Sequence, residues 1–170
     1  MPDDATADVI KTTRIRRLTF AGLWLLGFPC LAANLPDPTL TPGVIDPSCT
    51  ADTLRTTTTK GRRLTTQAMK DQAYRKYGMA AGQGACSGPQ GCEVDHRVPL
   101  EACGKDDQAN LWPMPYDGPC NAHDKDALEN QTKRDILAGT ITLEQGQARF
   151  LAPDWRVEYQ ARFGKSCDGQ

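Results

Sequence analysis

The sequence predicts an α+β fold, in which two short strands joined by a long loop precede a long helix and further helices lie at the periphery. Residues 93–100 have the pattern of a strand followed by a turn, and residues 110–114 form a second short strand before Pro115. Residues 121–137 contain neither Gly nor Pro, so they form the longest predicted helix, which ends at Gly139. We expect disulfide bonds to link these elements.

The composition excludes two classes of protein. Apolar residues make up 39% of the chain and charged residues 24%, which is typical of a globular domain and excludes a polytopic membrane protein. The formal net charge of -1 excludes a protein that coats nucleic acid by bulk positive charge. A local basic patch is still compatible with that charge.

Residues 1–33 have the pattern of a secretory signal peptide. A basic cluster precedes the apolar run 18–33, and small residues at the end of the run suit cleavage after Ala32 or Ala33. An uncleaved anchor is the alternative, but the run is shorter than the ~20 residues that a membrane-spanning helix needs. A lipoprotein is a third interpretation, which Pro29 opposes. We expect cleavage, and hence a secreted or periplasmic protein without stable membrane association.

The cysteines predict disulfide bonds. Cleavage would remove Cys30 and leave an even number of cysteines, which in an exported chain indicates disulfides whose pairing the sequence leaves open. A structural zinc site is the alternative, but it needs cysteine pairs about two to four residues apart. The closest pair, Cys86 and Cys92, is farther apart than that. The remaining cysteines are Cys49, Cys103, Cys120 and Cys167.

Residues 34–63 are expected to form an extended segment rich in Pro and Thr, and residues 64–170 the main domain. The threonine run 56–59 is compatible with a strand or a loop. The glycines at 82–91 indicate a loop that carries two cysteines.

Three further helices are predicted in the main domain. Residues 64–77 have helical character, with Thr65 or Thr66 able to cap the start. Residues 143–151 follow a capping box, and residues 154–163 form the last helix.

The motif with the most chemical content is Asp95-His96, which contains one of only two histidines and ends the first predicted strand. Hydrolysis of a phosphodiester needs a base to activate water, a cation to stabilise developing charge, and a group that holds the phosphate. Histidine is the natural base at neutral pH. An isolated Asp-His pair would occur by chance, so the interpretation depends on the residues that follow it.

The long predicted helix supplies those residues. Asn121, Lys125 and Glu129 are four residues apart and therefore share one face. Asp95 and Asn121 offer the hard oxygen ligands that Mg²⁺ prefers. Lys125 can hold a phosphate as a point charge, and Glu129 can hydrogen-bond metal-bound water. The alternative is a solvated polar face without chemistry, which does not explain the complete arrangement.

These motifs resemble the HNH, or ββα-metal, endonucleases, and especially their secreted bacterial branch. The core of that branch runs D-H-x-x-P-L-E, then N-L-W-P, then N-A-x-x-K-D-x-L-E-N. The corresponding segments here are residues 95–101, 110–113 and 121–130. The resemblance covers most of the chain after the leader. It implies a ββα-metal core, in which a two-stranded hairpin and a helix hold a divalent ion, Mg²⁺ or alternatively Mn²⁺.

The resemblance also implies a role for each matching residue. His96 would be the general base, and Asp95 and Asn121 would be metal ligands. Asn110 would brace the loop between the strands. Glu129, eight residues after Asn121, would orient metal-bound waters, as in the nonspecific nuclease branch of this superfamily.

The sequence departs from the family pattern in three ways. Cys103-Gly104 replaces the usual Gly-Gly after the first strand, which suggests that a disulfide pins that loop. The zinc-knuckle cysteines of many HNH enzymes are absent. His123 stands at a variable position and is an alternative metal ligand, but it lies about 200° around the helix from Asn121. We favour Asn121.

A basic cluster occupies residues 55–76, where Asp71 is the only acidic residue. Such a patch on a slightly acidic protein suits binding to a nucleic-acid backbone without sequence preference. A merely solvated basic helix face is the alternative. The residues expected to contact nucleic acid are Arg62, Arg63, Lys70, Arg75 and Lys76.

The sequence therefore predicts a monomeric, metal-dependent endonuclease that cuts DNA, with RNA as a second substrate to test. Two alternatives stay open. One is a non-catalytic secreted protein that binds nucleic acid or has a structural, disulfide-rich role. The other is a metal-dependent hydrolase of small phosphodiesters.

Overall fold

The computed structural model describes residues 35–80 and 89–167. They form helices and one two-stranded antiparallel sheet, so the predicted α+β fold class is confirmed. The predicted signal peptide and the loop segment with Cys86 lie outside the described residues. Within the described ranges, no helix is both long and apolar enough to cross a membrane.

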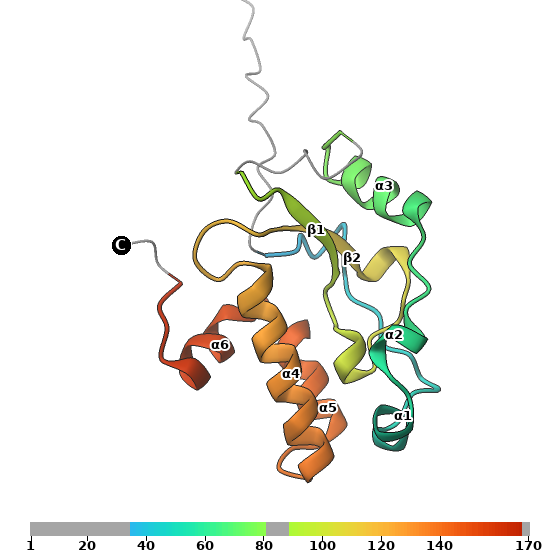
Figure 1. Cartoon of the computed structure of the whole chain (residues 1–170), viewed down its shortest axis with the longest axis vertical. Coiled ribbons are helices and arrows are strands. Elements are labelled where there is room, and N and C mark those ends of the chain that lie inside the picture. Colours follow the sequence, from blue (N-terminus) through green and yellow to red (C-terminus); the bar gives the residue numbers. More distant parts are fainter. Residues whose placement is uncertain (1–34, 81–88, 168–170) are drawn as a thin grey trace, which may run out of the picture.

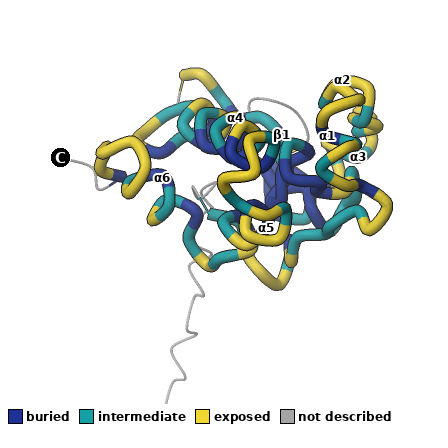
Figure 2. The backbone as a smooth tube through the Cα atoms, turned by 90° about the horizontal axis from the view of Figure 1, so that it is seen from below, coloured by how far each residue is buried: buried dark blue, intermediate teal, exposed yellow. Residues whose placement is uncertain are grey.

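The two-stranded hairpin lies at the centre of the structure (Figure 1). Helix α3 (Gln67–Lys76) contacts both strands, and helix α4 (Ala122–Ala138) lies on a different side of the hairpin and contacts the first strand. Helices α5 (Leu143–Leu151) and α6 (Arg156–Phe163) pack against α4. Burial is concentrated in the hairpin and the inward face of α4 (Figure 2). The largest buried side chains in this core include Trp112, Met114, Leu128, Phe150 and Tyr159.

Strands β1 (Cys92–His96) and β2 (Leu111–Pro115) pair antiparallel, with His96 opposite Leu111. Both predicted strands are present, although β1 ends earlier than the pattern at 93–100 suggested. Successive side chains of a strand point to opposite faces. Asp95 and His96 are neighbours in β1 and therefore point to opposite sides of the hairpin.

A tight turn follows β1. Pro99 has no N–H to donate to a strand ladder, and the short 3₁₀ helix η2 (Leu100–Ala102) begins directly after it. Cys103 then adopts a φ of 61°, in the left-handed region that favours glycine. At Gly104 a Cβ would lie 1.8 Å from the carbonyl oxygen of Val98, so only glycine fits there.

Two disulfides join segments that are far apart in the sequence. Cys49 is bonded to Cys103, and Cys120 is bonded to Cys167. Cys92 is also disulfide-bonded. The predicted disulfide at Cys103 is confirmed, and these cysteines are not ligands of a zinc site.

Helix α4 begins and ends as the sequence predicts, to within one residue. Asn121 is the N-cap, and its side chain and that of Asp124 form a capping box. Gly139 ends the helix with a φ of 72°. Helix α5 matches its predicted bounds and also has the predicted capping box. Helix α6 begins two residues later than predicted.

The N-terminal part differs most from the prediction. Helices α1 (Ala51–Thr56) and α2 (Thr59–Arg62) occupy the segment that was expected to be extended, with a strand or loop at the threonine run. Thr50 and Thr58 cap these helices. Threonine favours strands by propensity, but its hydroxyl also accepts a hydrogen bond from the backbone at a helix start.

Helix α3 starts at Gln67, with Thr66 as its N-cap, and not at residue 64. The reason is that the two residues before the cap are held by a distant side chain: Asp106 accepts hydrogen bonds from the backbone N–H of Leu64 and the hydroxyl of Thr65. Residues 63–66 therefore form a short non-helical link between α2 and α3, which we call the Asp106 strap.

Candidate active site

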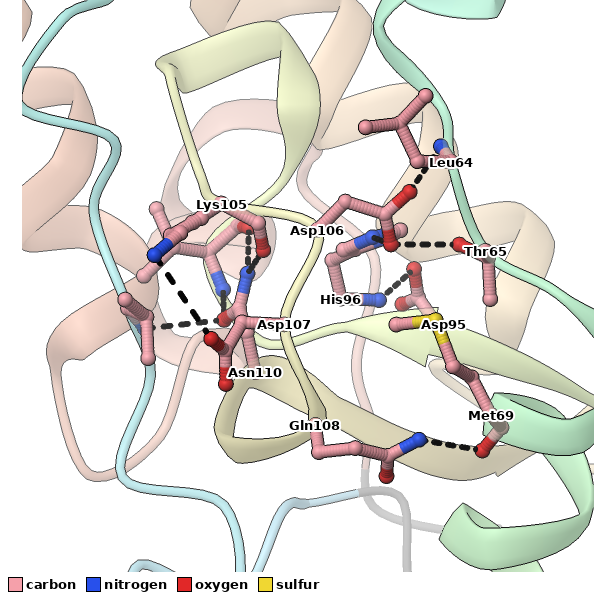
Figure 3. Close-up of polar contacts among 12 residues, drawn as sticks. Leu64, Thr65, Met69, Asp95, His96, Lys105, Asp106, Asp107, Gln108 and Asn110 are labelled. Atoms are coloured by element: carbon pink, nitrogen blue, oxygen red, sulfur yellow. Dashed lines mark hydrogen bonds and ion pairs between the residues drawn. The ribbon is translucent and has the colours of Figure 1, made fainter.

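His96 is the last residue of β1 and is almost completely buried, with 3% of its surface exposed. Its Nε2 atom lies 3.0 Å from Oδ1 of Asp106, in the loop between η2 and β2 (Figure 3). Among the described residues, no hydrogen bond reaches the other ring nitrogen, Nδ1. The imidazole is therefore anchored on one side and free to accept a proton on the other.

Asp106 is the partner that the sequence interpretation missed. Besides His96, it binds the backbone N–H of Leu64 and the hydroxyl of Thr65, the latter at 2.6 Å. Burial acts to raise the pKa of Asp106, but these hydrogen bonds outweigh it and hold the pKa below its ordinary value. Asp106 is therefore an anion at neutral pH. The only signal in the sequence was an acidic pair four residues before Asn110, which does not reveal where the side chain points.

Asp95 lies on the other face of β1, with 12% of its side chain exposed. Its Oδ1 accepts a hydrogen bond from the backbone N–H of His96 at 2.6 Å. Its Oδ2 lies 2.7 Å from Nζ of Lys125. The carboxylate thus sits between the predicted base and helix α4.

Lys125 is 1% exposed and uses all three of its ammonium N–H groups inside the protein. They are directed at the carboxylates of Asp95 and Glu129 and at the carbonyl oxygen of His96, the last at 2.8 Å. Burial acts to lower the pKa of Lys125, but Asp95 and Glu129 raise it above its ordinary value. All three N–H groups of Lys125 are thus directed at protein oxygens, an arrangement that leaves none for the predicted phosphate contact.

Glu129 is buried beside Lys125, one turn farther along α4. Burial raises its pKa well above the ordinary value, and the ammonium of Lys125 opposes that shift. Its Oε1 is directed at Lys125, and the predicted contact with metal-bound water stays a prediction. Lys125 lies between the carboxylates of Glu129 and Asp95 and pairs with both, so the two α4 side chains hold Asp95 in place.

Asn110 is fully buried and braces the loop between the strands. Its Oδ1 accepts from the backbone N–H groups of Val98 at 2.9 Å and Val44 at 3.3 Å. Its Nδ2 donates to the carbonyl oxygens of Val98 and Lys105, both at 2.8 Å. The side chain thereby links the N-terminal segment to both ends of the loop that carries Asp106.

Asn121 and His123 lie at the start of α4. Oδ1 of Asn121 accepts from the backbone N–H groups of His123 at 3.0 Å and Asp124 at 3.3 Å, as expected of an N-cap. The exposed ring of His123 stacks on Tyr116, with ring centroids 5.1 Å apart. Asn121 therefore has an oxygen of the predicted kind, but that oxygen is already in use by the cap.

Carboxylates surround Asp95. Glu93 is two residues away on the same face of β1 and accepts a hydrogen bond from the Tyr116 hydroxyl at 2.8 Å. Burial and the charge of Asp95 raise the pKa of Glu93, and the same two causes raise the pKa of Asp126 on α4. This side of the hairpin therefore holds an excess of negative charge.

The predicted nucleic-acid contacts separate into two groups. Arg63, Lys70 and Arg75 are exposed, and a cavity of about 150 Å³ lined by Arg63 and Lys70 lies between α3 and β1. Lys76, by contrast, donates to the carbonyl oxygens of Gln108 at 2.7 Å and Leu111 at 2.9 Å. Lys76 is therefore held by protein oxygens, unlike the three exposed cations, and its predicted nucleic-acid contact stays a prediction.

Arg62 is partly buried and directly precedes the Asp106 strap in the chain. Burial lowers its pKa, and within the described residues its Nε and Nη2 atoms have no hydrogen-bond partner. Its Nη1 contacts the sulfur of Cys49 at 3.6 Å. Arg62 is thus less available to a polymer than Arg63, which follows it in the chain.

The described residues contain no group of three or more His, Cys, Asp or Glu side chains that could hold a metal ion. Comparisons of the chain with protein-family models, curated proteins and solved structures found no match.

Proposed function

We propose that this protein is a divalent-metal-dependent endonuclease of the ββα-metal type, with His96 as the general base. The observation that carries the proposal is the buried pair of His96 and Asp106, placed one residue from Asp95 on a hairpin that α4 faces. A base, a hard oxygen ligand and a long helix thus meet at the end of one strand.

His96 is suited to take a proton from water. Its Nε2 side is held by the anionic Asp106 at 3.0 Å, and its Nδ1 has no partner among the described residues. A carboxylate on one nitrogen fixes the ring and stabilises the imidazolium that forms when the other nitrogen accepts a proton. This is the arrangement that a general base needs.

The oxygen donors near Asp95 fit Mg²⁺ or Mn²⁺ by their chemistry. Mg²⁺ takes few protein ligands and keeps several waters, which agrees with a site of one or two protein ligands. Asp95 is partly exposed and already holds a cation, the Lys125 ammonium. Neighbouring Glu93 and Asp126 add the negative charge that a divalent ion would neutralise.

The amide oxygen of Asn121 is chemically suited to be a second ligand. In this structure the same oxygen accepts the hydrogen bonds of the helix cap. When bound, the ion would stabilise the developing charge on the phosphate and the leaving oxygen. Lys125 and Glu129 would keep Asp95 in place. They would not contact the phosphate themselves.

The exposed cations Arg63, Lys70 and Arg75 would hold the nucleic-acid backbone along α3. Backbone contacts carry no sequence information, so we propose a nuclease with little sequence preference that acts on DNA and, as a second polymer to test, RNA. The disulfides agree with a secreted or periplasmic location, because such bonds persist in oxidising compartments. We propose that it acts as a monomer.

The test is cleavage of supercoiled plasmid by the oxidised protein with Mg²⁺, with parallel reactions in EDTA. His96→Ala should lower the rate by at least ~10²-fold while leaving the fold and DNA binding intact. His123→Ala is the matched control, since it removes the other histidine, and should stay within a few-fold of the unmodified protein. Undiminished cleavage by His96→Ala would exclude this mechanism.

The same assay separates the two alternative functions. A non-catalytic binding protein would retard DNA in a gel but leave it uncut with every divalent ion tested. A hydrolase of small diesters would cleave a chromogenic phosphodiester and spare the plasmid.

A further inference from the structure

We infer that Asp106 is the positioning residue of His96, and that it fixes which ring nitrogen of His96 carries the proton. The inference rests on the proposed function only where it predicts an effect on the rate of cleavage. The geometry of the pair and the protonation pattern of the ring can be tested without any nuclease activity.

The pair is protected from water. The side chains of His96 and Asp106 are 3% and 4% exposed, and Nε2 and Oδ1 are 3.0 Å apart. Hydrogen bonds are electrostatically stronger in such surroundings than in water. The contact joins the end of β1 to the loop between the strands, and it therefore fixes the ring relative to Asp95 as well (Figure 3).

The loop that carries Asp106 is itself held on both sides. Asn110 donates to the carbonyl oxygen of Lys105 at 2.8 Å, directly before Asp106. Asp107, directly after it, accepts from the backbone N–H of Ala109 at 2.9 Å. The carboxylate of Asp106 therefore has little freedom to move away from the imidazole.

The partners of Asp106 determine the tautomer of His96. An ionised carboxylate can only accept hydrogen bonds, so the shared proton must belong to Nε2 of the ring. In the neutral imidazole this leaves Nδ1 as the nitrogen with the lone pair. Asp106 thereby selects Nδ1 as the proton acceptor, in addition to orienting the ring.

The Asp106 strap links this pair to the exposed basic surface. Thr65 and the backbone N–H of Leu64 hold Asp106, while the neighbouring Arg63 side chain is exposed and lines the cavity beside β1. The segment that supports the base is therefore continuous with one that we propose to contact the polymer.

The experiment compares four forms of the oxidised full chain: the unmodified protein, Asp106→Asn, Thr65→Val and Asp107→Asn. Asp107→Asn is the matched control, because it makes the same chemical change one residue away while its amide oxygen can still accept the hydrogen bond from Ala109. The ring ¹⁵N–¹H correlation spectrum of each form is recorded at a pH where the histidines are neutral. With only two histidines in the chain, His123→Ala in the same background assigns the signals of His96.

We expect the unmodified protein and Asp107→Asn to show the Nε2–H tautomer of His96. In Asp106→Asn the His96 ring should no longer be restricted to one tautomer, since the side-chain amide of Asn can donate a hydrogen bond as well as accept one. Thr65→Val keeps the carboxylate but removes one of its donors, so it should retain the Nε2–H tautomer and give a broader signal. Thr65→Val leaves the His96–Asp106 pair intact, so it tests the inference even if Asp106→Asn does not fold. An Nδ1–H tautomer of His96 in Thr65→Val or in the unmodified protein would overturn the inference.

Cleavage provides the second readout. Asp106→Asn should lower kcat by roughly 10²-fold or more, as for other residues that orient a catalytic histidine, with KM within a few-fold. Asp106→Glu should restore part of that loss, and Asp107→Asn should lose little. An unchanged tautomer together with an unchanged kcat in folded Asp106→Asn would overturn the inference. If the unmodified protein cuts no nucleic acid, the proposed function fails, and the spectra alone decide the role of Asp106.

Discussion

The Lys125 ammonium and the Asp95 carboxylate form an ion pair of 2.7 Å that ties α4 to β1 in the interior of the protein. This pair is the closest link between the long helix and the strand that carries the candidate base. Glu129 and the carbonyl oxygen of His96 complete the surroundings of the ammonium. The orientation of α4 relative to the hairpin therefore depends on a lysine that never reaches the surface.

The first prediction concerns the stability provided by Lys125. Lys125→Met should lower the free energy of unfolding by roughly 3–5 kcal/mol, since it leaves the buried Glu129 and the largely buried Asp95 carboxylate without their cation. Adding Glu129→Gln should recover part of the loss, because one of those charges is removed. Urea denaturation followed by circular dichroism measures both effects. Lys60→Met, at an exposed lysine of α2, is the control, and an equal loss in that variant would contradict the prediction.

The second prediction separates the two roles of Asn121. Asn121→Ala should abolish Mg²⁺-dependent cleavage and also destabilise the protein by ~1 kcal/mol through the lost cap. Asn121→Ser keeps a capping hydroxyl, so it should restore stability but not cleavage. Thermal unfolding and plasmid cleavage are measured on the same samples. If Asn121→Ser cuts at the original rate, Asn121 serves only as a cap, and His123 must be tested as the ligand.

A third prediction concerns the basic surface. Arg63→Ala with Lys70→Ala should weaken DNA binding similarly for all sequences and reduce the slope of log K against log salt by about 0.9 per lost phosphate contact. Fluorescence anisotropy with His96→Ala in EDTA measures binding without cleavage. Arg134→Ala, at an exposed position of α4, should leave the slope unchanged. A solvated surface with no polymer contact would give the same slope in all three proteins.

The fourth prediction is a loss of stability in acid. The folded state holds the pKa of Asp106 below its ordinary value of about 3.9. The stabilisation from this group is therefore complete above that ordinary value and is lost as the pH falls below it. Asp106→Asn lacks this contribution, so its unfolding free energy should fall less steeply between neutral pH and acid. Parallel slopes for the two proteins would show that Asp106 is not held as an anion.

The hairpin and the long helix could be predicted because their signals are local. A capping residue, an uninterrupted helical stretch and a closing glycine define α4 within a single stretch of sequence. The threonine run was misjudged because one side chain can either favour a strand or cap a helix. In α1 and α2 the capping hydrogen bonds prevailed.

Features of the candidate site could be predicted only where the residues involved lie in one strand or one helix. The adjacency of Asp95 and His96 is visible in the sequence, but the contact of His96 with Asp106 depends on the path of the intervening loop. The helical period shows that Asn121, Lys125 and Glu129 share one face of α4, but not what that face contacts. Lys125 was expected to hold a phosphate and Lys76 to contact nucleic acid, and each side chain donates to oxygens of a distant segment that the local sequence does not reveal.

The Cys49–Cys103 bridge makes the candidate site sensitive to the compartment in which the chain is found. It fastens the N-terminal segment to the turn that precedes Lys105 and Asp106, across a sequence separation of 54. Closing a loop of that size restricts the unfolded chain by roughly 4 kcal/mol. A newly made chain in a reducing compartment lacks this restraint, so its loop opens more readily and Asp106 holds His96 less firmly. Under the proposed function, formation of this bond after export would delay full cleavage activity until the protein is away from the nucleic acid of the cell that makes it.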